Sequence, residues 1–139
     1  MIVVNFSDME GTLVSSGTLT AGNANAIAFA AINPAGAVRF ATKVVIDVTT
    51  PGGTAGSLLQ VGLADAADGT NIGTEFFPAA GLDLNTAAIN DSWNTTDTGV
   101  QVKFVVWAAS GADSYIVGKI LTQNAASLAG KYYIYSVPR

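Results

Sequence analysis

The chain contains neither cysteine nor histidine. Without cysteine it can form no disulfide, no thiolate nucleophile and no cysteine zinc site. Without histidine it lacks the commonest general base and the commonest transition-metal ligand, so histidine-based triads and histidine zinc hydrolases are excluded. Acidic side chains are then the only titratable groups available in number.

Charged side chains are also scarce, at 12% of 139 residues, against roughly 25% in an average soluble domain. Ten acidic and six basic residues give a net charge of −4. Such a charge balance does not favour binding to a phosphate backbone, so we expect no nucleic-acid partner. A free monomer usually needs more surface charge than this to stay soluble. We therefore predict that other protein covers part of the surface, in a homo-oligomer or a larger assembly.

No hydrophobic run is long enough for a membrane span. The most apolar window, residues 24–38, contains Asn33 and Pro34 and falls short of the roughly 20 apolar residues that cross a bilayer. The first residues carry no basic group and soon reach Asp8 and Glu10, unlike a signal peptide. We expect no membrane contact and no export through such a signal.

Alternating side chains predict a long strand over Ala37–Thr50, closed by Pro51 and two glycines. The side chains expected to share one face of it are Val38, Phe40, Thr42, Val44, Ile46 and Val48. Six further segments have strand-like composition: Thr12–Thr20, Asn25–Ile32, Ser57–Ala64, Val102–Ala109, Tyr115–Thr122 and Lys131–Val137. We expect Val102–Ala109 to be buried on both faces.

These strands, separated by turn-prone clusters, predict an all-β fold: one antiparallel β-sandwich of jelly-roll type with about seven to eight strands. The segment Leu82–Asn90 is the best candidate for a short helix, with an ordered loop as the alternative. Residues 1–139 are expected to form a single domain. The first eleven residues form a first strand, a frayed end or an extended N-terminal arm.

The acidic residues lie mostly in predicted loops, where aspartate commonly accepts hydrogen bonds from its own turn. A glycosidase would need two of them facing each other across a cleft, and the sequence does not show such a pair. The segment Asp65–Asn71 comes nearest to a calcium loop, but it lacks alternating carboxylates and a distal glutamate, which favours a plain β-connection. We assign no catalytic, cofactor or metal residue.

Several aromatic side chains are candidates for an interface. Phe76, Phe77 and Trp93 lie outside the clearest strands, and exposed aromatics mark sugar platforms or protein interfaces, with core filling as the alternative. Tyrosines at three of four consecutive positions near the C terminus must occupy both faces of their strand, so at least one ring reaches a surface or a partner. The predicted interface residues are Phe76, Phe77, Trp93, Tyr132 and Tyr135.

Five segments give the chain a resemblance to small structural proteins of tailed bacteriophages: Val45–Pro51, Leu59–Ala64, Ala67–Thr70, Ala80–Ala87 and Leu128–Tyr135. The likeness covers about residues 37 to 139 and consists of turn chemistry and strand composition. It implies a jelly-roll or similar β-sandwich with a capsid decoration (cement) or head-fibre role, often as a homotrimer bound to the major capsid protein. It also implies a location on the capsid surface of the virion after synthesis in the host bacterial cytoplasm. It carries no site residues.

We therefore expect a non-enzymatic virion protein, an oligomeric capsid decoration subunit that stabilises the phage head by adding interface area and avidity. The alternative is a head- or tail-fibre module that binds host surface glycans through Trp93 and the tyrosines. A third hypothesis, from another class, is a glycan or peptidoglycan hydrolase that uses paired carboxylates.

Overall fold

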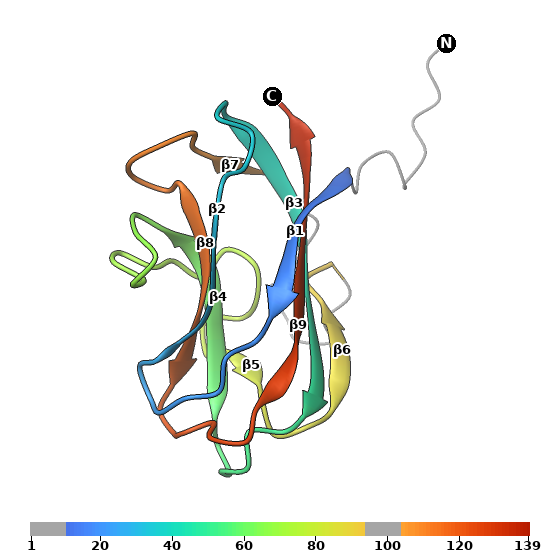
Figure 1. The fold of residues 1–139 in the computed structure, drawn as a ribbon, viewed down its shortest axis with the longest axis vertical. Coiled ribbons are helices and arrows are strands. Elements are labelled where there is room, and N and C mark those ends of the chain that lie inside the picture. Colours follow the sequence, from blue (N-terminus) through green and yellow to red (C-terminus); the bar gives the residue numbers. More distant parts are fainter. Residues whose placement is uncertain (1–10, 94–103) are drawn as a thin grey trace.

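The computed structural model describes residues 11–93 and 104–139, and among these residues it is built from strands and connections without a helix. The nine strands are β1 (Thr12–Thr18), β2 (Ile27–Ile32), β3 (Arg39–Thr50), β4 (Leu58–Ala64), β5 (Leu82–Asp83), β6 (Ala88–Asp91), β7 (Val105–Trp107), β8 (Tyr115–Leu121) and β9 (Ala129–Pro138). They form two antiparallel sheets that lie against each other (Figure 1). The predicted all-β sandwich is thereby confirmed. Within these residues, no helix has the length and apolar character needed to cross a membrane.

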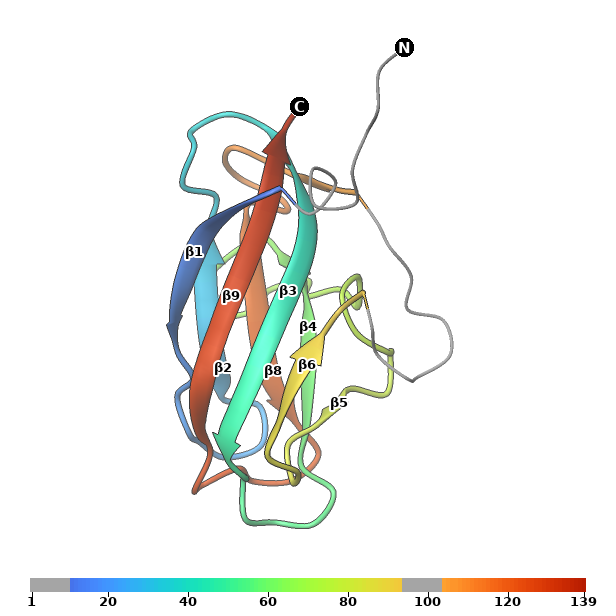
Figure 2. The same ribbon diagram turned by 90° about the vertical axis from the view of Figure 1, so that its right-hand side faces the viewer.

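The strand order is that of a jelly roll. One sheet has the order β1-β9-β3-β6, with β7 also paired to β3, and the other has the order β2-β8-β4-β5. The pairs β1/β9, β2/β8, β3/β6 and β4/β5 nest inside one another along the chain and alternate between the two sheets. A long hairpin rolled up on itself gives this pattern, which defines the double-sheet jelly roll. Figure 2 faces the β1-β9-β3-β6 sheet.

Apolar side chains from both sheets fill the space between them. The largest fully buried ones include Trp107, Phe77, Ile46, Leu59, Leu84 and Ile116. Trp107 donates its indole N–H to the carbonyl oxygen of Ser114 at 2.9 Å, so its polar atom is satisfied inside the core.

Seven strands were predicted from their patterns, and all seven exist with ends shifted by a few residues at most in the described chain.

A bulge in β3 changes the phase of the predicted alternation. Ala41 pairs with Ser136 and Lys43 with Tyr135, so Thr42 is an extra residue in this strand. Val44, Ile46 and Val48 face the core as predicted. Upstream of the bulge the faces are exchanged: Ala41 is fully buried, whereas the ring of Phe40 lies edge-on to Phe104.

Two predictions about local structure were wrong. The segment Leu82–Asn90 is not a helix but contains β5 and the start of β6. The carboxylate of Asp83 accepts hydrogen bonds from the amide of Asn85 at 2.9 Å and the hydroxyl of Thr86 at 2.8 Å, and these bonds form a turn in place of a helical one. The part of Val102–Ala109 that the structure describes is buried on one face only, because Phe104 and Val106 are exposed. The proposed N-terminal arm, residues 1–11, lies outside the described residues except for Gly11.

A stacked aromatic pair joins the two sheets. The rings of Phe29 on β2 and Tyr132 on β9 have centroids 4.3 Å apart and an angle of 15° between their planes. A glycine lies beside each ring: a Cβ on Gly17 would come within 2.9 Å of the Tyr132 ring, and a Cβ on Gly118 within 2.4 Å of the Phe29 ring. The two glycines therefore make room for the pair.

Candidate functional site

The outward-pointing side chains of β1, β3, β6, β7 and β9, together with Trp93 directly after β6 and Phe104 directly before β7, form the surface that we call the outer face. Strand register fixes which residues belong to it, because directly opposed residues of an antiparallel pair point to the same side. Three rows cross β1, β9 and β3: Leu13–Tyr135–Lys43, Ser16–Tyr133–Val45 and Thr18–Lys131–Asp47. β6 extends the last two rows with Asp91 and Ile89.

The outer face is unusually apolar for an exposed surface. Five large apolar side chains among the described residues are classed as exposed, and four of them lie here: Ile89 at 74%, Phe104 and Val106 at 48% each, and Leu13 at 45%. The fifth, Ile32, lies on β2 in the other sheet. Single exposed apolar residues are ordinary, but a group of them on one face marks an interaction surface.

The centre of the outer face is an aromatic cluster around one cation. The ammonium nitrogen of Lys43 lies 4.5 Å from the ring centroid of Tyr135 and 5.8 Å from that of Trp93. It also lies 3.9 Å from a carboxylate oxygen of Asp91, and the Lys43 side chain is only 9% exposed. The rings and the carboxylate replace water around a charge that alternation alone would leave in solvent.

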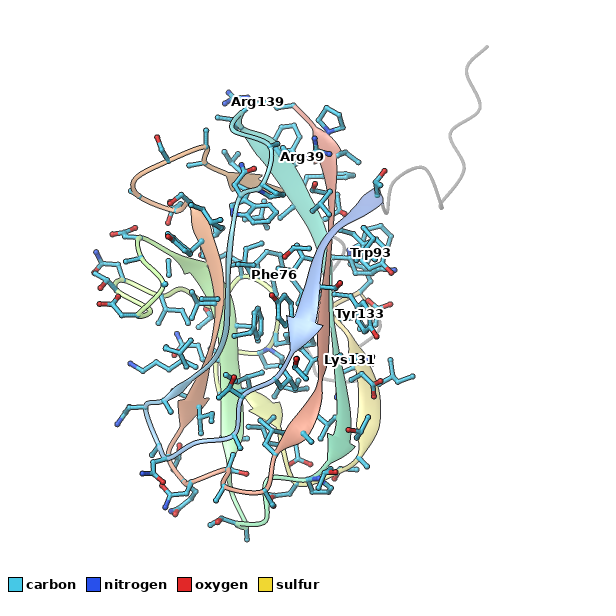
Figure 3. All side chains as sticks on the ribbon, viewed as in Figure 1. Arg39, Phe76, Trp93, Lys131, Tyr133 and Arg139 are labelled. Atoms are coloured by element: carbon cyan, nitrogen blue, oxygen red, sulfur yellow. The ribbon has the colours of Figure 1, made fainter. Side chains whose placement is uncertain are left out.

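Local structure after β6 holds Trp93 in this cluster. The Asp91 carboxylate accepts a hydrogen bond from the Trp93 amide at 2.9 Å, which makes a tight Asx turn. The indole N–H of Trp93 donates to the carbonyl oxygen of Thr42, the extra residue of the β3 bulge. Figure 3 shows Trp93 and Tyr133 on the same outward side of the sheet, with Lys131 below them.

The structure separates the five predicted interface residues into two groups. Trp93 and Tyr135 lie together on the outer face, around Lys43. Phe76 and Phe77 are buried in the core, so their placement at an interface is corrected: the Phe76 ring lies between the two sheets (Figure 3). Tyr132 points inward and stacks on Phe29, which also removes it from the outer face. Its neighbour Tyr133 points outward in its place.

The prediction missed several members of the outer face, namely Leu13, Lys43, Ile89, Phe104 and Val106. Alternation along Ala37–Thr50 puts Lys43 on the face opposite Val44 and Ile46, but nothing in the sequence indicates the rings around it. Ile89 was hidden by the helix interpretation, and Phe104 and Val106 by the expectation that their strand was buried on both sides. A better signal was the alternation Tyr133, Ile134, Tyr135 in the last strand, which separates core from surface once Ile134 is placed inside.

The two acidic side chains of the Asp65–Asn71 segment accept hydrogen bonds from the connections around them. The Asp65 carboxylate accepts hydrogen bonds from the side-chain amide of Asn71 at 2.7 Å and from the backbone N–H of Asp113 at 3.1 Å. Asp68 accepts from both the hydroxyl and the backbone N–H of Thr70, and these two bonds lower its pKa. Within residues 11–93 and 104–139, no three acidic side chains are grouped so that they could hold a metal ion.

The Glu75 side chain also bonds to the backbone. Its carboxylate accepts a hydrogen bond from the amide of Leu63 at 2.9 Å and lies over Gly62 and Gly73. A side chain on either glycine would collide with this carboxylate, so the two glycines and the acid form one local unit. Such an arrangement closes the connection after β4 rather than opening a cleft.

No protein-family model, curated protein or solved structure matches the chain.

Proposed function

We propose that this chain is a non-catalytic structural protein of a phage particle, a capsid decoration subunit that binds the major capsid protein and strengthens the head. The observation that carries the proposal is the outer face: an exposed, largely apolar sheet surface in a chain with few charges. Such a surface is stable in water when another protein covers it. The resemblance to small structural proteins of tailed phages suggests that this other protein belongs to a phage particle.

The fold is compatible with this role, because double-sheet jelly rolls serve as viral capsid domains and as lectins. Fold alone does not assign function, so the proposal depends mainly on the apolar outer face. The turn-forming roles of Asp65, Asp68, Asp83 and Glu75 support a protein without catalysis. The lowered pKa of Asp68 makes this one carboxyl unsuited to act as a general acid at neutral pH, which needs a raised pKa.

The proposal is tested with phage particles made with and without the gene for this chain. We expect the chain to co-purify with complete particles, and electron microscopy to show its density on the outside of the head. Particles without it should keep the same head geometry but rupture at a lower temperature. Purified chain added back should restore their stability. Absence of the chain from complete particles would contradict the proposal.

A second function is favoured by one specific observation, the rings of Trp93 and Tyr135 gathered on an open sheet face beside the Asp91 carboxylate. Aromatic rings with polar neighbours can stack on sugars, and the chain would then be a fibre module that binds host surface glycans. A glycan array separates the two functions. Binding that is lost in Trp93→Ala, and kept in Phe77→Leu as a core control, would favour the fibre module.

A further inference from the structure

We propose that the outer face is where this chain meets a second copy of itself. The inference rests on the proposed function in one respect, the need for protein to cover this face, and it names which protein does so. Contacts to a capsid would then be made by other parts of the surface.

The first argument is the distribution of charge. Among the described residues of the outer face, two cations, Lys43 and Lys131, balance two anions, Asp47 and Asp91, so their formal charges sum to zero. Arg39, the other charged residue of these strands, instead donates its Nε–H to the hydroxyl of Ser136 at 2.6 Å. The other described residues carry five carboxylates against three cations, so the rest of the described chain has a net charge of −2.

This distribution decides which surfaces of two identical copies can approach. Copies that meet through the remaining surface bring like net charges together, which disfavours association. Copies that meet through the outer face bring two neutral surfaces together. Each surface has anions and cations side by side, as in the directly opposed pair Asp47 and Lys131. A neutral patch of mixed sign can complement itself, which a contact between identical surfaces requires.

The second argument is size. β3 has 12 residues and β9 has 10. β1, β6 and β7 are shorter, with 7, 4 and 3 residues. At about 3.3 Å per residue and about 4.8 Å per strand, the five strands together cover roughly 570 Å² in projection. A stable interface buries about 800 Å² of accessible surface per partner, and accessible area exceeds projected area because side chains roughen the surface. One copy can therefore supply the area that self-association needs.

The third argument is the kind of packing available. Two sheets stack face to face at about 10 Å when apolar side chains from both interdigitate, as the two sheets of this sandwich already do. Ile89 is largely exposed on the outer face, and Val106 and Leu13 are about half exposed there. A second outer face would bury them in the same manner, whereas a soluble glycan would leave the peripheral Ile89 and Val106 in water.

The experiment measures assembly of the full chain by sedimentation from about 1 to 100 µM. We expect species larger than the 14.1 kDa monomer, and we expect Ile89→Asp and Val106→Asp each to weaken association by at least about tenfold, because each buries a charge in the contact. The matched control is Ile32→Asp, a similarly exposed isoleucine on the other sheet. It should leave association unchanged. Circular dichroism and melting temperature identify any variant that fails to fold.

If the aspartate variants do not fold, a milder substitution can test the same contact. The chain has no cysteine, so Ile89→Cys carries a single thiol on the outer face and Ile32→Cys a single thiol on the other sheet. We expect the thiol of Ile89→Cys to react several-fold more slowly with a maleimide at 100 µM chain than at 1 µM. The thiol of Ile32→Cys should react at the same rate at both concentrations.

A chain that stays monomeric at 100 µM would overturn the inference, as would an oligomer that resists both aspartate variants. These outcomes are separate from the test of the proposed function, which is whether the chain is part of the particle. A monomeric chain that still decorates capsids would leave the proposed function standing, with the outer face as the capsid contact. A self-associating chain absent from particles would leave only the inference standing.

Discussion

Lys43 on β3 and Tyr135 on β9 are directly opposed across the centre of the outer face, and the lysine ammonium lies 4.5 Å from the tyrosine ring centroid. The pair places a nearly buried charge on the negative face of a ring, with Asp91 at 3.9 Å. A cation is thus tolerated on this apolar surface because aromatic and acidic groups surround it. The arrangement depends on the sign of the charge as well as on the shape of the side chain.

The first prediction separates charge from shape at Lys43. Lys43→Met keeps the aliphatic stem and should lower the free energy of unfolding by about 1 kcal/mol, because it removes one cation–π contact and a long ion pair. Lys43→Glu should lower it by at least about 3 kcal/mol, since a carboxylate would face both the ring and Asp91. Urea unfolding followed by tryptophan fluorescence measures both.

Lys131→Met on the same face is the control for this prediction. Its side chain is exposed, so the change should stay within about 0.5 kcal/mol. Equal stability of Lys43→Met and Lys43→Glu would show that the cluster does not discriminate charge.

The second prediction concerns Asn33, a buried residue that ties the β2–β3 connection to β7. Its side-chain amide donates to the carbonyl oxygens of Ala37, Trp107 and Ala108 at 2.9, 3.0 and 3.1 Å. Asn33→Asp keeps the shape but places a carboxylate against these three oxygens. We expect it to cost about 3 kcal/mol at pH 7. The loss should shrink as the pH falls, because the protonated carboxyl can donate one hydrogen bond.

Asn33→Ala provides the comparison, since it removes the donors without adding a charge. Its cost should be about 2 kcal/mol and independent of pH between 4 and 7 relative to the parent chain. Denaturant unfolding at several pH values measures both variants. The prediction fails if Asn33→Asp shows the same pH dependence as Asn33→Ala.

The strands of this fold could be predicted from the sequence because alternation and turn residues are local signals. Val44, Ile46 and Val48 face the core as alternation required. The exchange of faces at Ala41 could not be predicted, because the bulge at Thr42 exists only relative to β9. Likewise, β5 and β6 are too short to show a period, and their pairing partners lie far away in the chain.

The candidate site was predicted only in part, for a related reason. Of the residues that the sequence singled out, Trp93 and Tyr135 lie on the outer face. What brings them together is Lys43, which is fifty residues from Trp93 and about ninety from Tyr135. Phe76 and Phe77 look identical to surface aromatics in sequence, because the loop that contains them shows no pattern. Their burial follows from packing against both sheets, which composition does not encode.

The third prediction tests the glycine beside the stacked pair. Gly118→Ala would place a Cβ 2.4 Å from the Phe29 ring, and we expect it to cost about 1–3 kcal/mol because the ring must leave its position against Tyr132. Phe29→Leu removes Cε1, the ring atom that the new Cβ meets most closely, and the atoms beyond it. In the Phe29→Leu background, Gly118→Ala should therefore cost at least about 1 kcal/mol less than in the parent chain, as a double-mutant cycle would measure.

Gly130→Ala is the matched control for this cycle. Its Cβ would meet the Asp47 carbonyl oxygen at 2.0 Å, a backbone atom, so Phe29→Leu should give no relief. Additive costs for Gly118→Ala and Phe29→Leu would show that the ring does not set the limit at Gly118.

The last prediction concerns the pH dependence contributed by Asp68. The pKa of this fully exposed carboxyl is lowered from 3.8 mainly by the hydrogen bond from the Thr70 hydroxyl and next by that from the Thr70 backbone amide. Because the folded value lies below the unfolded one, the stability that Asp68 contributes is present above pH 3.8 and is lost as the pH falls through the folded value. Thr70→Val removes the hydroxyl bond and keeps the backbone bond, so an NMR titration of the Asp68 carboxyl carbon should move upward towards 3.8. Thr86→Val, which alters the equivalent hydroxyl beside Asp83, should leave the Asp68 titration unchanged. An Asp68 titration in Thr70→Val identical to that of the parent chain would mean that the hydroxyl is not what holds the carboxylate in its charged form.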